Sequence, residues 1–143
     1  MKDSSEKIVL VGGCFDILHV GHIRFLKKAK ALGDKLIVLL ESDKRISQMK
    51  GEGRPINSQK IRAEVLSSLK YVDEVISLPS NMNNNRFDLL VKKIKPDFIA
   101  TTKGDSNIEY KKRAAKLVNA KVIIVTPRVG GYSTSKLISK QLS

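Results

Sequence analysis

The sequence predicts a single-domain α/β fold, in which a five-stranded parallel sheet is doubly wound in the Rossmann-like manner over residues 1–143. Short runs rich in Ile, Val and Leu alternate with longer stretches of helical period, which is typical of a mostly parallel sheet covered on both faces. A length of 143 residues with 41% hydrophobic and 29% charged residues suits one globular domain.

Five apolar runs are the expected strands, at residues 7–11, 35–40, 74–77, 97–101 and 121–125. Helical period between the runs predicts helices near residues 20–32, 58–69, 86–94 and 108–118, and a last helix from about Thr134. The stretches 48–55 and 80–85 have no period and are expected to be loops.

Residues typical of helix ends support these boundaries. Gly33 stands where a left-handed cap of the first helix is expected, and Pro96 separates the third helix from the fourth strand. Asn57 or Ser58 can cap the second helix, and Ser133 can cap the last one.

The composition favours a small anionic ligand. Lysine and arginine number 27 against 14 acidic residues, a formal net charge of +13 that attracts anions. These charges are spread along the chain, and four Phe and three Tyr without Trp offer little for base stacking, so no specific nucleic-acid partner is expected. The longest apolar run, 36–40, is far below the roughly 18 residues of a membrane helix, and the single cysteine excludes an intrachain disulfide. We expect a cytoplasmic protein with no membrane partner.

A segment rich in glycine and histidine, residues 12–22, follows the first expected strand. In a doubly wound sheet phosphates bind here, because glycine lets the backbone approach an anion and the next helix offers free N–H groups. His19 and His22, the only two histidines, project from one face of that helix if it begins near them. Gly21 removes a side chain beside the imidazoles. The segment therefore predicts an anion site.

Three other interpretations of this segment stay open. The histidines can be core residues with satisfied hydrogen bonds. Cys14, His19 and His22 can supply three ligands of a catalytic zinc site, although the glycines would have no role in it. A plain dinucleotide-binding turn is a weaker hypothesis, because the spacing from Gly13 to Gly21 is not that of G-x-G-x-x-G.

Residues 13–22 match the signature G-x-F-D-x-x-H-x-G-H and so resemble the HxGH nucleotidyltransferases of the cytidylyltransferase-like family. A second segment, 132–136, resembles the S-T-[ST]-K motif of the last helix in that family. Nearly the whole chain is similar to the adenylyltransferase module of ADP-heptose synthesis, which serves the lipopolysaccharide core. Cys14, the segment 50–57 (KGEGRPIN), Arg62 and the stretch 71–76 carry this similarity.

The resemblance implies transfer of AMP from ATP to a phosphate-bearing acceptor such as heptose 1-phosphate, with release of pyrophosphate. It also implies Mg²⁺ with the triphosphate, no organic cofactor and no separate metal site, and a homodimer. Arg128 and the segment 103–105 depart from the heptose pattern. FMN, or CTP with glycerol 3-phosphate, are therefore alternative substrates. A nucleotide-binding regulator is the non-enzymatic alternative.

The family's functional residues map onto particular positions of this chain. Catalytic roles fall on His19, His22 and Lys50. Phosphate or acceptor contacts fall on Lys50, Arg62 and Arg128. Nucleotide contacts fall on Gly13, Cys14, Phe15, His19, Gly21, His22, Lys103, Gly104, Asp105, Tyr132, Ser133, Thr134 and Ser135. The sequence has no obvious pair of catalytic carboxylates, which fits an acceptor whose phosphate is itself the nucleophile.

Overall fold

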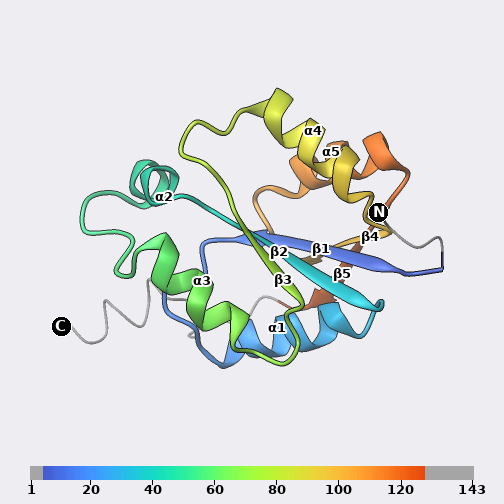
Figure 1. Cartoon of the computed structure of the whole chain (residues 1–143), viewed down its shortest axis with the longest axis horizontal. Helices are drawn as coiled ribbons and strands as arrows, with labels where there is room; N and C mark the ends of the chain where they lie inside the picture. Colours follow the sequence, from blue (N-terminus) through green and yellow to red (C-terminus); the bar gives the residue numbers. More distant parts are fainter. Residues whose placement is uncertain (1–4, 128–143) are drawn as a thin grey trace.

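The structure of the protein is a computed structural model, and it describes residues 5–127. Five parallel strands form one sheet in the order β3-β2-β1-β4-β5 (Figure 1). The strands are β1 (Ile8–Gly13), β2 (Lys35–Leu40), β3 (Glu74–Ser77), β4 (Phe98–Thr102) and β5 (Lys121–Thr126). The helices are α1 (Val20–Lys30), α2 (Asp43–Lys50), α3 (Gln59–Ser67), α4 (Asn84–Ile94) and α5 (Ile108–Val118). The predicted fold class is confirmed.

The sheet reverses its winding direction between β1 and β4. From β1 the chain moves outward to β2 and then β3, and it returns through α4 to β4 on the other side of β1. Loops that leave β1 and β4 therefore diverge to opposite faces, which opens a crevice at the carboxyl ends of these strands. The histidine-containing segment leaves β1 at this crevice.

Helices cover both faces of the sheet, with α1 and α3 on one face and α4 and α5 on the other (Figure 1). Alternation along β1 divides its side chains between two cores. Val9 and Val11 pack in the core that includes Leu26 of α1 and Leu66 of α3. The other core contains Ile8 and Leu10 together with Val91, Ala114 and Ala115. Because each face of β1 packs against a helical layer, its side chains are apolar on both faces.

Helix α2 was not predicted from the sequence, and the predicted loop 48–55 begins inside its last turn. The helix has eight residues and buries only Ile46, so it offers no repeating apolar face for a pattern to reveal. The hydroxyl of Ser42 caps it by accepting from the backbone N–H of Arg45 at 3.1 Å. Similarly, α4 begins at Asn84, inside the predicted loop 80–85.

The predicted left-handed cap at Gly33 is wrong. Helix α1 ends on a right-handed cap, Ala31, with φ −64°. At Gly33 a Cβ atom would lie 2.7 Å from the carbonyl oxygen of Lys7, so glycine is required there for close packing. Left-handed caps occur instead at Lys95 and Asn119, with φ of 54° and 57°.

Two other helix-end predictions are confirmed. Ser58 caps α3 by accepting from the backbone N–H of Ile61 at 3.4 Å, and Pro96 lies between α4 and β4. The last predicted helix and its cap, Ser133, lie outside the described residues.

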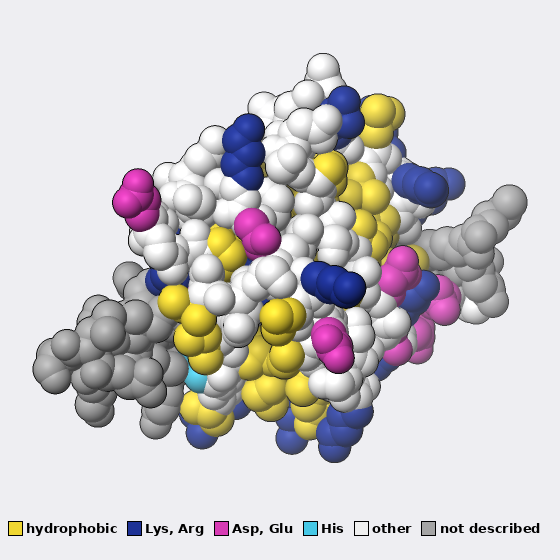
Figure 2. Space-filling view, turned by 60° about the vertical axis from the view of Figure 1, so that its left-hand side comes forward, with side chains coloured by type: hydrophobic (Ala, Val, Ile, Leu, Met, Phe, Trp, Pro, Cys, Tyr) yellow, Lys and Arg dark blue, Asp and Glu magenta, His cyan; other side chains and the backbone are white. Residues whose placement is uncertain are grey.

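The distribution of charged side chains and the length of the helices are relevant to two possible partners, nucleic acid and a membrane. Over most of the face in Figure 2, lysine and arginine side chains stand apart and acidic side chains lie among them. Within residues 5–127, no helix has the length and apolar character needed to cross a membrane. The absence of a specific nucleic-acid partner stays a prediction.

Candidate active site

The two histidines form the first turn of α1. His19 is the N-cap residue, and its Nδ1 accepts a hydrogen bond from the backbone N–H of Gly21 at 3.1 Å. Nδ1 of His22 in turn accepts from the backbone N–H of His19 at 3.2 Å. The ring centroids are 3.8 Å apart. The imidazoles thus form a reciprocal capping box at the N-terminus of the helix. They lie on one face of its first turn, as the sequence predicted.

This capping fixes the protonation of both rings. Burial, together with the charges of His19 and Lys50, lowers the pKa of His22 to about 4. Burial also lowers the pKa of His19. A neutral imidazole whose Nδ1 accepts a hydrogen bond carries its proton on Nε2. Each ring therefore has an Nε2–H donor at neutral pH, beside the partial positive charge of the helix N-terminus.

Phe15 shapes the loop between β1 and α1, here termed the motif loop (residues 14–18). Its φ is 46°, a left-handed conformation that is unfavourable for an aromatic residue, and its side chain is buried. A Cβ atom on Gly13 would lie 2.9 Å from Cε2 of Phe15. The glycine of the signature is therefore required by the packing of this ring. The ring also contacts His22, with centroids 5.4 Å apart.

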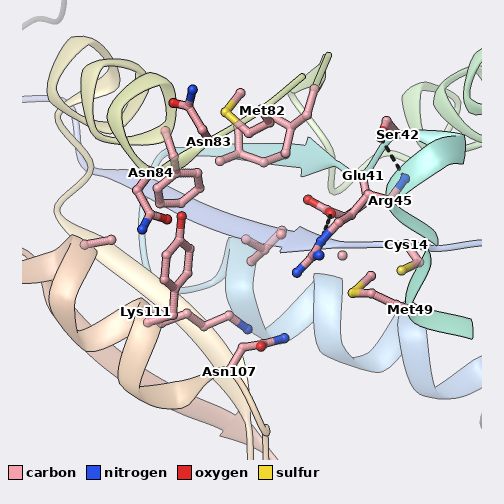
Figure 3. Close-up of a pocket in the computed structure, with 18 of the residues that line it drawn as sticks. Cys14, Glu41, Ser42, Arg45, Met49, Met82, Asn83, Asn84, Asn107 and Lys111 are labelled. Atoms are coloured by element: carbon pink, nitrogen blue, oxygen red, sulfur yellow. Dashed lines mark hydrogen bonds and ion pairs between the residues drawn. The ribbon is translucent and has the colours of Figure 1, made fainter. Parts of the chain in front are cut away.

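Two cavities meet at the motif loop. The first, here termed the histidine cavity, has about 390 Å³ and is lined by the motif loop, both histidines, Lys50 and the ends of β4 and β5. The second, here termed the asparagine cavity, has about 530 Å³ and lies between the ends of β1 and β2, α2, the start of α4 and α5 (Figure 3). Residues 12–14, Asn107 and Lys111 line both cavities, which therefore adjoin.

Lys50 and Asp105 line the histidine cavity and come from different elements. Lys50 is the last residue of α2, and Asp105 follows β4. Burial alone would raise the pKa of Asp105, but hydrogen bonds from Lys111, Thr101 and Asn107 lower it below its ordinary value. Lys103 and Gly104 lie in the turn before Asp105 and line neither cavity.

Lys111 was not singled out from the sequence. It pairs with Asp105 and donates to Oγ1 of Thr101 at 3.2 Å. In the sequence it stands in a run of three basic residues, and nothing there separates it from the others. Its position at both cavities follows only from the placement of α5 against β4.

The structure gives Arg62 a supporting position, and its predicted contact with a phosphate stays a prediction. Its side chain is 0% exposed, and three protein oxygens occupy its guanidinium. Nε donates to the carbonyl of Asn57 at 3.0 Å, Nη1 to the carbonyl of Cys14 at 2.8 Å and Nη2 to Asp43 at 2.7 Å. Arg62 therefore ties α3 to the motif loop and α2, and it lines neither cavity.

Asp16 has a comparable supporting role that the sequence analysis missed. Its carboxylate accepts from Nε of Arg54 at 3.0 Å and from the backbone N–H groups of Ile56 at 2.8 Å and Asn57 at 2.9 Å. Burial would raise its pKa, but these hydrogen bonds lower it. The signal was present, since Asp16 belongs to the signature and its partners to KGEGRPIN. The contacts fasten the segment after Lys50 to the motif loop.

Some predicted site residues lie beyond the described part of the chain: Arg128, Tyr132, Ser133, Thr134 and Ser135. Between residues 5 and 127, no group of three or more His, Cys, Asp or Glu side chains is placed to hold a metal ion. The zinc interpretation of Cys14, His19 and His22 therefore lacks a ligand cluster in the structure.

The fold and the site together define a nucleotide-binding α/β domain, with two imidazole donors, a lysine and a helix N-terminus at the crevice of a doubly wound sheet. Residues 10–140 match the cytidylyltransferase-like family model. The chain belongs to this family and is a nucleotidyltransferase.

Comparison with individual proteins agrees with the family. The chain is 50% identical over 94 residues to the bifunctional protein HldE of Pseudomonas savastanoi pv. phaseolicola, covering 66% of the chain and 19% of that relative. It is 39% identical to HldE of Campylobacter jejuni subsp. doylei, covering 98% of the chain and 29% of that relative. The chain thus spans less than a third of either protein.

A solved structure supports the same grouping. The lipopolysaccharide core biosynthesis protein from Thermoplasma volcanium is 30% identical, with a TM-score of 0.64 over 90% of this chain and 99% of that one. With the HldE matches, this similarity confirms the resemblance seen in the signature and in the segment 50–57.

Proposed function

We propose that this chain transfers AMP from Mg²⁺-bound ATP to the phosphate of a sugar 1-phosphate, with heptose 1-phosphate as the first candidate. The observation that supports the proposal most is the capping arrangement of His19 and His22. Both Nδ1 atoms accept backbone hydrogen bonds, so two neutral Nε2–H donors stand at the N-terminus of α1. This arrangement suits donation to a phosphate chain and not removal of a proton.

The reaction needs donors and no general base. An oxygen of the acceptor phosphate attacks the α-phosphorus of ATP, the bond from that phosphorus to the oxygen bridging to the β-phosphate breaks, and pyrophosphate leaves with the electron pair. A phosphate monoester has a second pKa near about 6, so the acceptor is mostly a dianion at neutral pH. His19, His22 and Lys50 then stabilise the charge that develops on the phosphate chain.

The two adjoining cavities suit two substrates. The histidine cavity would hold the triphosphate and nucleoside, and the asparagine cavity would hold the acceptor. Their shared wall at residues 12–14 is then where the two phosphates meet. Asp16 and Asp105, the carboxylates that line the histidine cavity, are already occupied by protein donors. Mg²⁺ would therefore arrive as part of the nucleotide substrate.

One observation favours FMN as a second acceptor. The rings of Phe87 and Tyr110 lie 5.0 Å apart, and both residues line the asparagine cavity. Aromatic side chains offer a stacking surface to a flavin ring. We place FMN second, because Glu41, Asn84 and Asn107 line the same cavity and suit the hydroxyl groups of a sugar.

Pyrophosphate release tests the proposal. ATP or CTP is combined with heptose 1-phosphate, other sugar 1-phosphates, FMN and glycerol 3-phosphate. We expect release with ATP and a sugar 1-phosphate. Release only with CTP and glycerol 3-phosphate would contradict both the nucleotide and the acceptor, and release with no pair would favour a nucleotide-binding regulator. Light scattering on the same preparation tests the expected homodimer.

A further inference from the structure

Three carboxylates line the two cavities, and they differ in how well the protein satisfies them. Asp16 accepts three hydrogen bonds, from Arg54 and from two backbone N–H groups. Asp105 accepts from Thr101, Asn107 and Lys111. Glu41, in the asparagine cavity, receives no hydrogen bond on its carboxylate from any of residues 5–127. It is the one cavity carboxylate in the described chain whose acceptor capacity is open.

The position of Glu41 is well fixed. It directly follows β2, and its backbone N–H donates to the carbonyl of Gly13 at 3.0 Å, which joins it to the start of the motif loop. Its side chain is only 26% exposed, and Nε of Arg45 lies 3.7 Å from Oε2, an ion pair longer than a hydrogen bond. Figure 3 shows Glu41 and Arg45 together at the cavity, beside Cys14 and across from Lys111.

A partly buried carboxylate that accepts no hydrogen bond from residues 5–127 costs free energy, since it has lost part of its water and the ion pair with Arg45 replaces that water only in part. Burial accordingly raises the pKa of Glu41, while Arg45 and Arg62 oppose this rise. The cost is relieved when a ligand brings hydrogen-bond donors. The open side of Glu41 faces a cavity of about 530 Å³, so such a ligand has room to bind there.

We infer that Glu41 is a specificity-determining residue, which accepts hydrogen bonds from hydroxyl groups on the sugar part of the acceptor. The inference rests on the proposed function. A carboxylate repels phosphate, so the group that Glu41 binds is the body of the acceptor and not its phosphate. The acceptor phosphate would lie toward the shared wall, where Lys111 is present.

Hydroxyl groups fit this position better than an ammonium group does. A cation placed at Glu41 would also meet Arg45, whose side chain is 59% exposed, and Arg62, which contributes to the same electrostatic field. The amides of Asn84 and Asn107 line the same cavity and both donate and accept hydrogen bonds, as hydroxyl groups do. Besides burial, Glu41 contributes to the raised pKa of the Cys14 thiol and of the Tyr110 phenol, so both groups are uncharged at neutral pH.

The test compares Glu41→Gln with Glu64→Gln, which makes the same change in charge on the exposed surface of α3. Pyrophosphate release is measured with heptose 1-phosphate, its monodeoxy analogues and phosphoethanolamine. In Glu41→Gln the amide oxygen can still accept from a hydroxyl, but the hydrogen bond is no longer to a charged group. KM for heptose 1-phosphate is therefore expected to rise about 3- to 10-fold, with kcat and KM for ATP within about twofold. Glu64→Gln should match the wild type.

The monodeoxy analogues identify the hydroxyl involved. The wild type should discriminate against one or two of them, and this discrimination should be smaller in Glu41→Gln, whose amide oxygen accepts a weaker hydrogen bond. The melting temperature of Glu41→Gln should equal or exceed that of the wild type, because a neutral amide replaces an unsatisfied carboxylate. A lower melting temperature together with a raised KM for ATP would indicate a structural role and contradict the inference.

The remaining outcomes separate this inference from the proposed function. If the wild type uses heptose 1-phosphate and Glu41→Gln behaves like Glu64→Gln, the proposed function stands and the role of Glu41 is wrong. If phosphoethanolamine is preferred to every sugar 1-phosphate, the hydroxyl assignment is overturned. If no sugar 1-phosphate supports release, the proposed function itself fails.

Discussion

The backbone N–H of His19 donates to Nδ1 of His22 at 3.2 Å, so one catalytic candidate holds the other in a single tautomer. The reciprocal bond, from Gly21 to Nδ1 of His19, does the same for the first ring. A proton on either Nδ1 would break a cap of α1. The helix end therefore opposes protonation of the rings, in addition to the effect of burial.

We expect His22 to titrate with a pKa of about 4 and to hold its proton on Nε2 at pH 7. Nitrogen-15 correlation spectra of the two imidazoles, recorded from pH 7 to pH 3.5, measure both properties. The two histidines are distinguished by comparing the wild type with His19→Gln. A pKa near the ordinary 6.5, or a proton on Nδ1, would contradict the capping arrangement as the source of the donors.

The same shift predicts how stability depends on pH. The pKa of His22 is lower in the folded protein than in the unfolded chain. The contribution of neutral His22 to the free energy of unfolding is therefore fully present above about pH 6.5. It is lost as the pH falls toward 4, where the unfolded chain has taken up a proton that the folded protein has not. Denaturant unfolding at pH 7 and pH 4 should show a smaller loss for His22→Gln than for the wild type, by up to about 3 kcal/mol. An equal loss in both proteins would contradict the lowered pKa.

Replacement of either histidine by alanine should lower kcat about 100- to 1000-fold, the usual effect of removing one donor to a transition state. His19→Ala also removes the N-cap of α1, which should cost roughly 1 kcal/mol of stability. Arg24→Ala, on the exposed surface of the same helix, is the control and should retain full activity. Near-normal turnover in both histidine variants would place the active site elsewhere.

Much of the fold followed from the sequence because the central strands β1 and β2 are largely buried and read as continuous apolar runs, and the other strands keep shorter apolar runs. The winding of the chain then places the loop after β1 at the crevice, so His19 and His22 were found by position as well as by motif. Helix α2 escaped prediction because it buries one residue, Ile46. Lys50 is the last residue of this helix, so its position could not be predicted from the local sequence pattern either.

Side-chain roles were harder to predict than positions. An arginine in a sequence has the same symbol whether it binds phosphate or supports a loop, and only burial separates the two for Arg62. Lys111 and Glu41 are ordinary charged residues in the sequence, and only the packing of α5 against β4 and the pairing of β2 with β1 bring them to the cavities. Such long-range placement depends on tertiary contacts that composition and spacing do not report.

Lys50→Met should lower kcat/KM for ATP about 10- to 100-fold, because a positive charge near the phosphates is lost. The variant should also raise the pKa of His22, since Lys50 contributes to its lowering. Lys60→Met, on the exposed surface of α3, makes the same change away from both cavities and should alter neither quantity. Steady-state kinetics and the imidazole titration measure the two effects independently. An unchanged pKa with full activity would show that Lys50 does not act on the phosphate site.

Arg62→Met should destabilise the protein by about 1 to 3 kcal/mol, because it leaves the half-exposed Asp43 carboxylate and two partly buried carbonyls without their donor. Arg62→Lys keeps the charge but not the three-way geometry, and should lose a smaller part of the stability. Arg24→Met, on the exposed surface of α1, serves as the control and should change the free energy of unfolding by less than about 0.5 kcal/mol. Denaturant unfolding measures all three variants.

Saturation kinetics on Arg62→Lys, which keeps the positive charge, then distinguish a supporting role of Arg62 from direct contact with a substrate. A supporting residue should leave KM for ATP and for the acceptor within about threefold once the folded fraction is accounted for. If Arg62→Lys keeps the stability of the wild type and raises either KM tenfold or more, the guanidinium contacts a substrate phosphate after all, and its burial against Cys14 and Asp43 describes only the protein without substrates.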